Sequence, residues 1–272
     1  MLVFKTAHEL RSCFKSNTQT LGLVPTMGTL HEGHLSLVRK ACEENDTVVV
    51  SIYINPTQFN DTTDLEKYPS DLEKDKTLLK PFSNQLVLYA PDHKELYPEG
   101  IQSKTYDFGT LVTQMEGAFR EGHFNGVATV VETLFKKIQP HRAYFGEKDF
   151  QQLILIKSLA EKLNPDLNVV GCKTIREKDG LAMSSRNKLL SKKERESAGE
   201  IIKLLLKAKE MNSSFNYRKI KNEVDRHINS IEGITLEYFE IMDLSKFINI
   251  SEKRAFIACK VGNVRLIDNI SL

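Results

Sequence analysis

Two histidines three residues apart, His31 and His34, are the residues whose types and spacing most directly suggest chemistry in this sequence. They belong to residues 25–34, which follow an apolar, strand-like run and precede an amphipathic stretch, so we expect a strand-to-helix turn there. Thr29 and Glu32 have the spacing of a capping box, which predicts Thr29 as the N-cap and Glu32 as the third helical residue. The two imidazoles would then share one face of the first helical turns.

The chemistry that such a turn favours is the binding of phosphate. A helix N-terminus attracts anions, and ligands of open α/β sheets bind at the carboxyl ends of the strands. Two imidazole donors placed there would suit a polyphosphate. The residues alone leave two alternatives open: a capped helix with surface histidines, and a metal site, which would need further ligands because the HExxH spacing is absent. No Gly-x-Gly and no Gly-Lys-[Ser/Thr] occurs, which excludes the usual dinucleotide and P-loop motifs.

Lys148 lies in a second segment, residues 145–152, that has the pattern of a strand-to-helix turn. It would project at the same sheet edge as the two histidines, where a lysine neutralises phosphate as a point charge. The alternative is a solvated lysine between two acidic neighbours, with Asp149 and Gln152 serving only as helix-capping residues.

Three further polar segments are candidates for substrate or phosphate binding. Asn55 precedes Pro56 and is therefore directed away from helix, and Gln58 offers both a donor and an acceptor. His123 lies in a turn between two glycines, before an apolar helix. Residues 183–187 combine two hydroxyls with a guanidinium, which suits phosphate. Ordinary turn and linker chemistry explains each segment equally well.

The elements that must position these residues indicate an α/β fold. Short β-branched runs alternate with helical patterns through the first two thirds of the chain, which predicts a parallel sheet covered on both faces. The expected strands are 21–24, 47–54, 85–89, 143–145 and 167–170, and the expected helices are 35–41, 72–79, 127–138 and 150–163.

After about residue 175 the order of elements changes. Helices at 192–211 and 217–231 come first, and strands at 236–241 and 254–259 follow, which predicts a small α+β domain. We therefore expect one domain over residues 1–175 and a second over 176–272, with a hinge near 183–187.

Composition excludes several classes of protein. Of the 272 residues 40% are hydrophobic and 27% are charged, which is ordinary for a chain with a sizeable core. The 38 basic and 36 acidic residues nearly balance, so no nucleic-acid or membrane partner is indicated. The four cysteines are scattered, and the apolar runs are too short to span a bilayer. These features predict a cytoplasmic protein.

Six motifs, in order and over nearly the whole chain, resemble the pantothenate synthetase (pantoate–β-alanine ligase) family. They lie at residues 25–34, 55–59, 122–131, 145–152, 176–187 and 265–269. The departures are mild: Thr29 stands where the family often has alanine, Ile54 replaces a common valine, and Glu121 replaces a common proline.

The resemblance implies a Rossmann-like domain of the HxGH nucleotidyltransferase type, a smaller C-terminal lid domain and a homodimer. It also implies an ATP-dependent ligase. ATP and (R)-pantoate would give pantoyl adenylate and pyrophosphate, and β-alanine would then displace AMP to yield pantothenate. Mg²⁺ would accompany ATP, with no ligand on the protein assigned.

The family's functional residues carry over to matching positions of this chain. The resemblance implies catalytic roles for His31, His34, Lys148 and Arg186, with His34 as a proton donor. The implied ATP site comprises Met27, Gly28, Thr29, Leu30, His31, Glu32, Gly33, His34, Gly146, Glu147, Lys148, Asp149, Ile175, Met183, Ser184, Ser185 and Arg186. Gln58 would bind pantoate and β-alanine, and Gln152 pantoate, with Asn55 and His123 as further substrate-site candidates.

Three other functions remain to be weighed against this one. A nucleotidyltransferase that stops at the first transfer would keep the fold, but the motifs around Gln58 and Gln152 argue against it. A relative of the aminoacyl-tRNA synthetases would share His-x-Gly-His, but the near-neutral charge and the lack of an anticodon-sized extension argue against a tRNA partner. A non-catalytic nucleotide-binding module would have no need of His34, Lys148 and Arg186.

Overall fold

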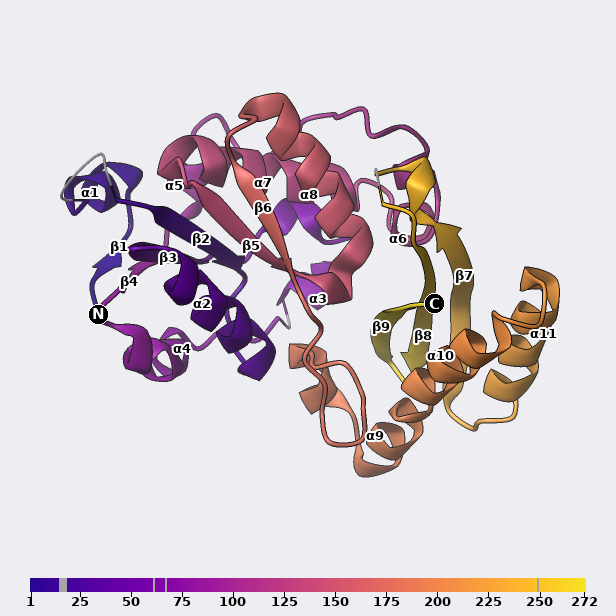
Figure 1. Ribbon diagram of the computed structural model, residues 1–272. Coiled ribbons are helices and arrows are strands. Elements are labelled where there is room, and N and C mark those ends of the chain that lie inside the picture. The colour runs from indigo at the N-terminus through magenta and orange to yellow at the C-terminus, as the bar shows by residue number, and fades with distance from the viewer. Residues whose placement is uncertain (15–18, 61, 67, 249) are drawn as a thin grey trace. The chain divides into compact units, whose positions relative to one another are not determined.

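The computed structural model describes residues 1–14, 19–60, 62–66, 68–248 and 250–272 (Figure 1). The chain divides into two units. The N-terminal unit consists of residues 1–147 and 151–173, and the C-terminal unit consists of residues 148–150 and 174–272.

Six strands form the sheet of the N-terminal unit, and every neighbouring pair is parallel. Consecutive residues of the central strands are buried, because helices cover both faces of the sheet. This confirms the predicted α/β class. The strands lie in the order β1 (Val3–Phe4), β4 (Leu86–Tyr89), β3 (Thr47–Ile52), β2 (Leu21–Thr26), β5 (Arg142–Gly146) and β6 (Asn168–Cys172).

The chain reverses its direction of growth across the sheet at β2. This strand pairs with β3 on one side and with β5 on the other. At such a switch point the connections on the two sides diverge and leave a crevice at the carboxyl ends of the strands. β2 ends at Thr26 and β5 ends at Gly146, so the turn that contains His31 and the turn that begins at Glu147 follow the two strands that flank this point.

Eight helices accompany the sheet in the described part of the N-terminal two thirds. The helix predicted to begin at residue 127 begins at His123, because Gly122 adopts the left-handed conformation (φ 75°) and ends the preceding turn there. The helices are α1 (Ala7–Ser12), α2 (Glu32–Glu44), α3 (Thr62–Glu66), α4 (Leu72–Leu79), α5 (His93–Leu96), α6 (Glu116–Phe119), α7 (His123–Ile138) and α8 (Phe150–Leu163).

A polar stripe on helix α7 holds residues 104–106 in place. The side-chain oxygen of Asn125 accepts a hydrogen bond from the backbone N–H of Tyr106 (3.1 Å). One turn further on, the hydroxyl of Thr129 accepts from the backbone N–H of Lys104 (2.9 Å). The stripe therefore satisfies backbone groups of a segment that has no strand partner of its own.

Glu132 completes this stripe as a buried carboxylate. It accepts hydrogen bonds from the Tyr106 hydroxyl, from Lys136 and from Lys104, the last at 3.0 Å. Burial by itself would raise the pKa of Glu132, but the hydrogen bonds from these three partners outweigh it and hold the pKa at about 2.

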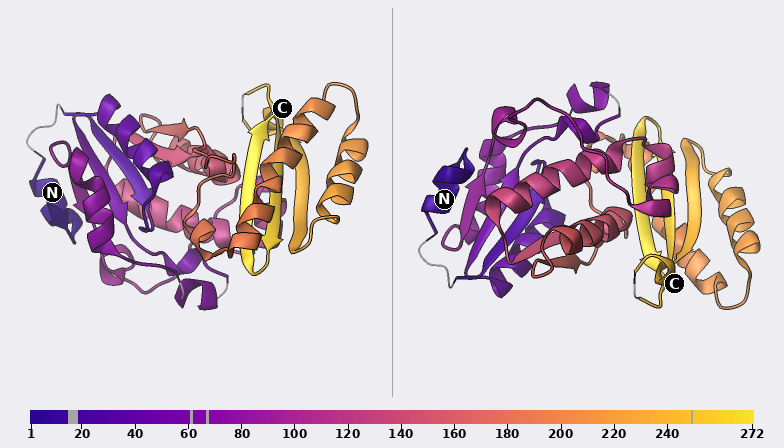
Figure 2. Two further views of the ribbon diagram at one scale, coloured as in Figure 1. Left: turned by 90° about the horizontal axis from the view of Figure 1, so that it is seen from below. Right: turned by 90° about the horizontal axis from the view of Figure 1, so that it is seen from above.

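The C-terminal unit is built on a three-stranded antiparallel sheet (Figure 2). Its order is β7 (Ile234–Asp243), β8 (Lys253–Val261) and β9 (Val264–Ser271). Helices α10 (Glu200–Met211) and α11 (Tyr217–Ile228) pack on this sheet, and α9 (Lys192–Ala198) contacts β8. This confirms the predicted smaller α+β part.

Two details of this unit differ from the prediction. The helix expected over 192–211 is broken at Gly199, which ends α9 and begins α10; glycine carries a high conformational cost inside a helix. Strand β9 was not predicted, because Asp268 and Asn269 interrupt its apolar pattern. Both are buried, and both make hydrogen bonds to arginine side chains.

Replacement of Glu132 by glutamine tests the buried carboxylate. Its folded-state pKa lies below its ordinary value of 4.5, so its contribution to stability is complete above about pH 4.5 and is lost as pH falls toward 2. We expect Glu132→Gln to lower the free energy of unfolding by about 1–3 kcal/mol at pH 7. Urea unfolding should show that the difference in the free energy of unfolding between the wild type and Glu132→Gln is smaller at pH 3 than at pH 7. Glu73→Gln, at an exposed ion pair with Lys76, is the control and should change little at either pH. A difference in the free energy of unfolding that is equally large at both pH values would contradict this account.

Candidate functional site

The turn after β2 begins helix α2 differently from the prediction. Helix α2 starts at Glu32, and its N-cap is His31, whose Nδ1 accepts a hydrogen bond from the backbone N–H of Gly33 (3.1 Å). The predicted capping box with Thr29 as N-cap is therefore wrong. Thr29 instead lies in the left-handed region (φ 53°), and its N–H donates to the carboxylate of Asp75 at 2.9 Å.

The two histidines lie side by side at the start of α2. The ring centroids of His31 and His34 are 4.1 Å apart, which confirms that the sequence spacing brings the two imidazoles together. Nδ1 of His31 accepts a hydrogen bond, so the neutral ring carries its hydrogen on Nε2. The Nε2–H group is therefore a hydrogen-bond donor.

Asn55 secures the turn that carries Gln58. Asn55 is buried just after β3, and its Nδ2 donates to the Gln58 Oε1 (3.0 Å) and to the carbonyl of Gly126 (3.1 Å). The Tyr97 hydroxyl donates to Asn55 Oδ1 at 2.6 Å, and burial raises the pKa of this tyrosine, so its proton stays available. Asn55 is thus a buried support of the Gln58 side chain.

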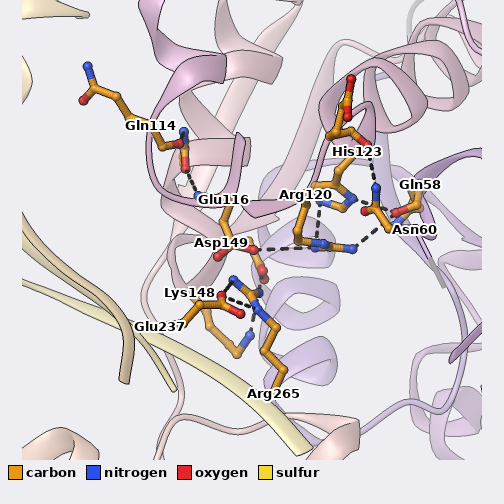
Figure 3. Close-up of polar contacts among 12 residues, drawn as sticks. Gln58, Asn60, Gln114, Glu116, Arg120, His123, Lys148, Asp149, Glu237 and Arg265 are labelled. Carbon is orange, nitrogen blue, oxygen red and sulfur yellow. Dashed lines mark hydrogen bonds and ion pairs between the residues drawn. The ribbon is translucent and has the colours of Figure 1, made fainter. Parts of the chain in front are cut away.

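His123 and Arg120 hold the backbone of Gln58 (Figure 3). Nε2 of His123 lies 3.0 Å from Arg120 Nη1, and Nδ1 of His123 lies 2.8 Å from the carbonyl oxygen of Gln58. A guanidinium only donates and a carbonyl only accepts, so neutral His123 carries its hydrogen on Nδ1. Arg120 also donates to the same carbonyl at 3.2 Å and forms an ion pair with Glu116. His123 is therefore a buried helix residue that fixes the turn, and Arg120 is a member of the cluster that the sequence analysis missed.

Two adjacent glutamines at the start of α8 have different surroundings. Gln151 is buried, its Nε2 donates to the carbonyl of Gln114 (2.9 Å), and its Oε1 accepts from the backbone N–H of Glu116 (3.1 Å). It thereby anchors the segment that leads into α6. Gln152, the predicted pantoate residue, is only half-buried.

In the C-terminal unit, Lys148 is held through its backbone. Its carbonyl accepts a hydrogen bond from Asn269 Nδ2 (2.8 Å), and Arg254 donates to Asn269 Oδ1 (2.6 Å). Nζ of Lys148 lies 3.8 Å from the Asp149 carboxylate, an ion pair that leaves the ammonium adaptable. Strand β9, which the sequence analysis missed, therefore supports a predicted catalytic residue.

A charge pair lies on the three-stranded sheet of the C-terminal unit (Figure 3). Arg265 donates to Glu237 at 2.8 Å through Nε and at 2.5 Å through Nη2. The arginine of the sixth sequence motif thus forms an ion pair within the C-terminal unit.

Residues 175 and 183–186, which are also predicted to bind ATP, belong to a short hairpin in the C-terminal unit. The backbone N–H of Met183 donates to the carbonyl of Ile175 (3.0 Å), and the side chain of Ser184 accepts from the backbone N–H of Arg186 (3.2 Å). Ser185 is buried. This ordered turn is the segment predicted to be a hinge, and that role remains a prediction.

The structure thus divides the predicted site residues between the two units. The N-terminal unit holds Met27, Gly28, Thr29, Leu30, His31, Glu32, Gly33, His34, Asn55, Gln58, His123, Gly146, Glu147 and Gln152, and the C-terminal unit holds Lys148, Asp149, Ile175, Met183, Ser184, Ser185 and Arg186. Within the first group, the His31–His34 pair and the cluster of Asn55, Gln58 and His123 are each brought together.

The described residues contain neither a metal-binding cluster nor a helix suited to crossing a membrane. No group of three or more His, Cys, Asp or Glu side chains is arranged to hold a metal ion in that part of the chain. None of the helices within the same ranges combines the length and the apolar character needed to cross a membrane.

Comparison with known proteins gives consistent matches over the whole chain. The model of the family described as Pantoate-beta-alanine ligase matches residues 2–271. A pantothenate synthetase of Bacteroides fragilis is 45% identical over 279 residues, which cover 99% of this chain and 98% of that protein. One from Christiangramia forsetii is 47% identical over 264 residues, covering 95% and 93%.

Solved structures agree with these matches. The pantothenate synthetase of Thermus thermophilus is 39% identical, with a TM-score of 0.91 and 99% coverage of both chains. The pantoate–β-alanine ligase of Francisella tularensis, solved in complex with "beta-gamma ATP" and β-alanine, is 34% identical, with a TM-score of 0.82 and coverage of 100% and 97%.

Gly126→Ala tests how closely α7 approaches the Gln58 turn. A Cβ at Gly126 would clash with the carbonyl oxygen of Thr57 and lie 2.7 Å from the backbone nitrogen of Gln58, and backbone atoms cannot move aside as a flexible side chain can. We expect a loss of about 1–3 kcal/mol in the free energy of unfolding, measured with urea. Gly146→Ala, where a Cβ meets no atom within 4 Å, is the control and should unfold near the wild-type midpoint. A Gly126→Ala protein as stable as the wild type would show that the contact is looser than described.

Proposed function

Because the chain belongs to the pantoate–β-alanine ligase family, we propose that it makes pantothenate through a pantoyl-adenylate intermediate. The observation that supports this most directly is the pairing of His31 and His34 at the N-terminus of α2, beside the switch point of a parallel sheet. The Francisella tularensis relative, solved with an ATP compound and β-alanine, supports the choice of these two substrates.

The first proposed step transfers AMP to pantoate. A carboxylate oxygen of pantoate attacks the α-phosphorus of ATP, and the bond from this phosphorus to the bridging oxygen breaks, so that pyrophosphate leaves. The carboxylate is already ionised at neutral pH, so the step needs no general base. It needs alignment of the two reactants and stabilisation of the negative charge that develops on the phosphates.

We assign that stabilisation to the site residues that can donate hydrogen bonds or carry positive charge. The Nε2 hydrogen of His31 is a fixed donor, because Gly33 occupies Nδ1. His34, one turn along α2, serves as the proton donor, and Lys148 and Arg186 supply positive charge. The remaining members of the proposed ATP site are Met27, Gly28, Thr29, Leu30, Glu32, Gly33, Gly146, Glu147, Asp149, Ile175, Met183, Ser184 and Ser185.

The second proposed step forms the amide bond. The amine of β-alanine attacks the acyl carbon of the adenylate, and the bond from this carbon to the AMP oxygen breaks, so AMP leaves with the oxygen that came from pantoate. The β-alanine ammonium must lose a proton before it attacks, and uptake of free amine from solution meets this need. Gln58 would bind both pantoate and β-alanine, and Gln152 would bind pantoate. An amide side chain suits this double role because it both donates and accepts.

Three further features are proposed from the resemblance. Mg²⁺ enters with the phosphates of ATP, since the described residues provide no three-ligand metal group and Mg²⁺ commonly binds through substrate phosphates. The C-terminal unit, with a hinge near residues 183–187, acts as a lid that protects the hydrolysable adenylate. The chain works as a homodimer in the cytoplasm.

The direct test follows the products and one labelled oxygen. With ATP, Mg²⁺ and (R)-pantoate alone, we expect at most one pyrophosphate per enzyme; adding β-alanine should give continuous AMP and pantothenate. Pantoate labelled with ¹⁸O in its carboxylate should transfer one label to AMP, because the attacking oxygen stays on phosphorus. AMP without label would rule out the adenylate, and continuous pyrophosphate without β-alanine would indicate simple nucleotidyl transfer.

Two substitutions test the assigned charges and donors. His34→Ala and Lys148→Ala should each lower turnover by about 10²–10³, the usual cost of deleting one donor to developing charge, while the proteins stay folded. Lys193→Ala removes an exposed lysine that pairs only at the surface with Glu232, and it should keep wild-type turnover. Wild-type turnover in either test variant would remove that residue from the mechanism.

A further inference from the structure

The carboxylate of Asp75 binds the loop that leads into α2. Asp75 lies in α4 and is 2% exposed. Its Oδ2 accepts a hydrogen bond from the backbone N–H of Thr29 (2.9 Å), and its Oδ1 accepts from the N–H of Leu30 (2.7 Å). A buried carboxylate is costly unless it is hydrogen-bonded, so the two N–H groups and the carboxylate stabilise one another.

The loop has a conformation that its own residues do not favour. Gly28 and Thr29 both have positive φ, 81° and 53°. The second is unusual for a β-branched residue, which persists there only when its surroundings hold it. A Cβ at Gly28 would lie 3.0 Å from the Asp75 carboxylate and 3.1 Å from the Ile52 side chain, so another residue would be strained by the positive φ and tightly packed as well. Asp75 supplies the external support.

The loop directly precedes the paired histidines. Residues 28–30 run straight into His31, which is the N-cap of α2 and lies against His34. Any shift of this loop therefore moves the start of the helix and the ring of His31.

We propose that Asp75 is a positioning residue, which holds the loop of residues 28–30 so that His31 and His34 meet the phosphates of ATP. This inference rests on the proposed function for the histidine pair. The role is distinct from stabilisation of α4, because the N-cap of that helix is Asp71, which accepts from the backbone N–H of Lys74 (3.0 Å).

Asp75→Asn is the matched substitution. It keeps the volume but replaces one acceptor by an amide NH₂, which turns a donor toward one of the two backbone N–H groups. We expect the rate of pyrophosphate formation from ATP and pantoate to fall about 10- to 100-fold, because a misplacement of about 1 Å can cost on the order of 10²-fold. The reaction of supplied pantoyl adenylate with β-alanine should stay within about twofold.

Asp71→Ala is the control for the stability of α4. It removes the helix cap, at a cost of the kind expected for any N-cap, without touching the loop. We expect its rate of pyrophosphate formation to match the wild type. If Asp71→Ala slows this step as much as Asp75→Asn does, the effect belongs to the helix and the proposal is overturned.

A spectroscopic readout separates positioning from general damage. In ¹⁵N-histidine NMR, the wild-type His31 should show the Nε2-protonated tautomer, because Gly33 donates to Nδ1. His31→Gln assigns the signal. Asp75→Asn should shift it toward a tautomer mixture while the signal of His227, in α11, stays unchanged. An unaltered His31 signal together with wild-type rates would overturn the proposal.

Two comparisons keep the proposal independent of the proposed function and of folding. If His34→Ala is as fast as the wild type, the proposed ATP site is wrong; if His34→Ala is slow and Asp75→Asn is fast, only the role of Asp75 fails. If Asp75→Asn does not fold, Gly28→Ala decides, because it keeps Asp75 and displaces the loop. Gly28→Ala should slow pyrophosphate formation and shift the His31 signal, and no change in either would overturn the proposal.

Discussion

Parallel pairing of β2 with both β3 and β5 is the constraint on which the rest of the N-terminal unit depends. Parallel strands place all their carboxyl ends at one edge, and the change of direction at β2 leaves the flanking turns without a crossing connection. The turns after β2 and β3 carry the histidine pair and Gln58, respectively. Strand pairing and the burial of β-branched residues fix the position of this edge. The short turns at the edge can therefore hold functional side chains in defined positions.

Each of these turns is secured by polar side chains, and most of these side chains come from another part of the chain. The carboxylate of Asp75 binds the loop before α2, and Asn55 and His123 bind the side chain and the carbonyl of Gln58. Within the C-terminal unit, Asn269 does the same for the carbonyl of Lys148. A turn that is held in this way loses less conformational entropy when it binds a ligand. Its hydrogen-bond donors already face the charge that develops during the reaction.

Hydrophobic periodicity and residue composition were sufficient to predict the helices and strands whose hydrophobic patterns are strong. Residues 21–24 are apolar and lie within the buried strand β2. Residues 47–54 are rich in β-branched side chains and form β3, which ends at Ile52, two residues before the predicted end. The predictions were wrong where a residue that is distant in sequence determines the local conformation. Thr29 has the spacing of an N-cap, but Asp75, 46 residues away, binds its N–H and moves the cap to His31. Strand β9 was missed because its polar residues Asp268 and Asn269 are buried and bind the arginines Arg176 and Arg254 instead of facing solvent. Asp75, Arg120 and Tyr97 share this property: each makes a hydrogen bond to a residue that is distant in sequence, and no short motif contains them.

The electrostatic character of the clusters fits the different demands of the two proposed steps. Adenylation gathers negative charge on phosphates, and the groups assigned to it are donors or cations, such as His31 and Lys148. Amide formation must accommodate a carboxylic acid derivative and an amine in turn, and the cluster around Gln58 includes amide, hydroxyl and imidazole groups. In that cluster Arg120 already forms an ion pair with Glu116 and hydrogen bonds with His123 of α7 and with the carbonyl of Gln58, so its charge is directed toward the cluster. A neutral amide at Gln58 can then bind either substrate without favouring one charge, which is the property a residue needs when it contacts both partners of a condensation.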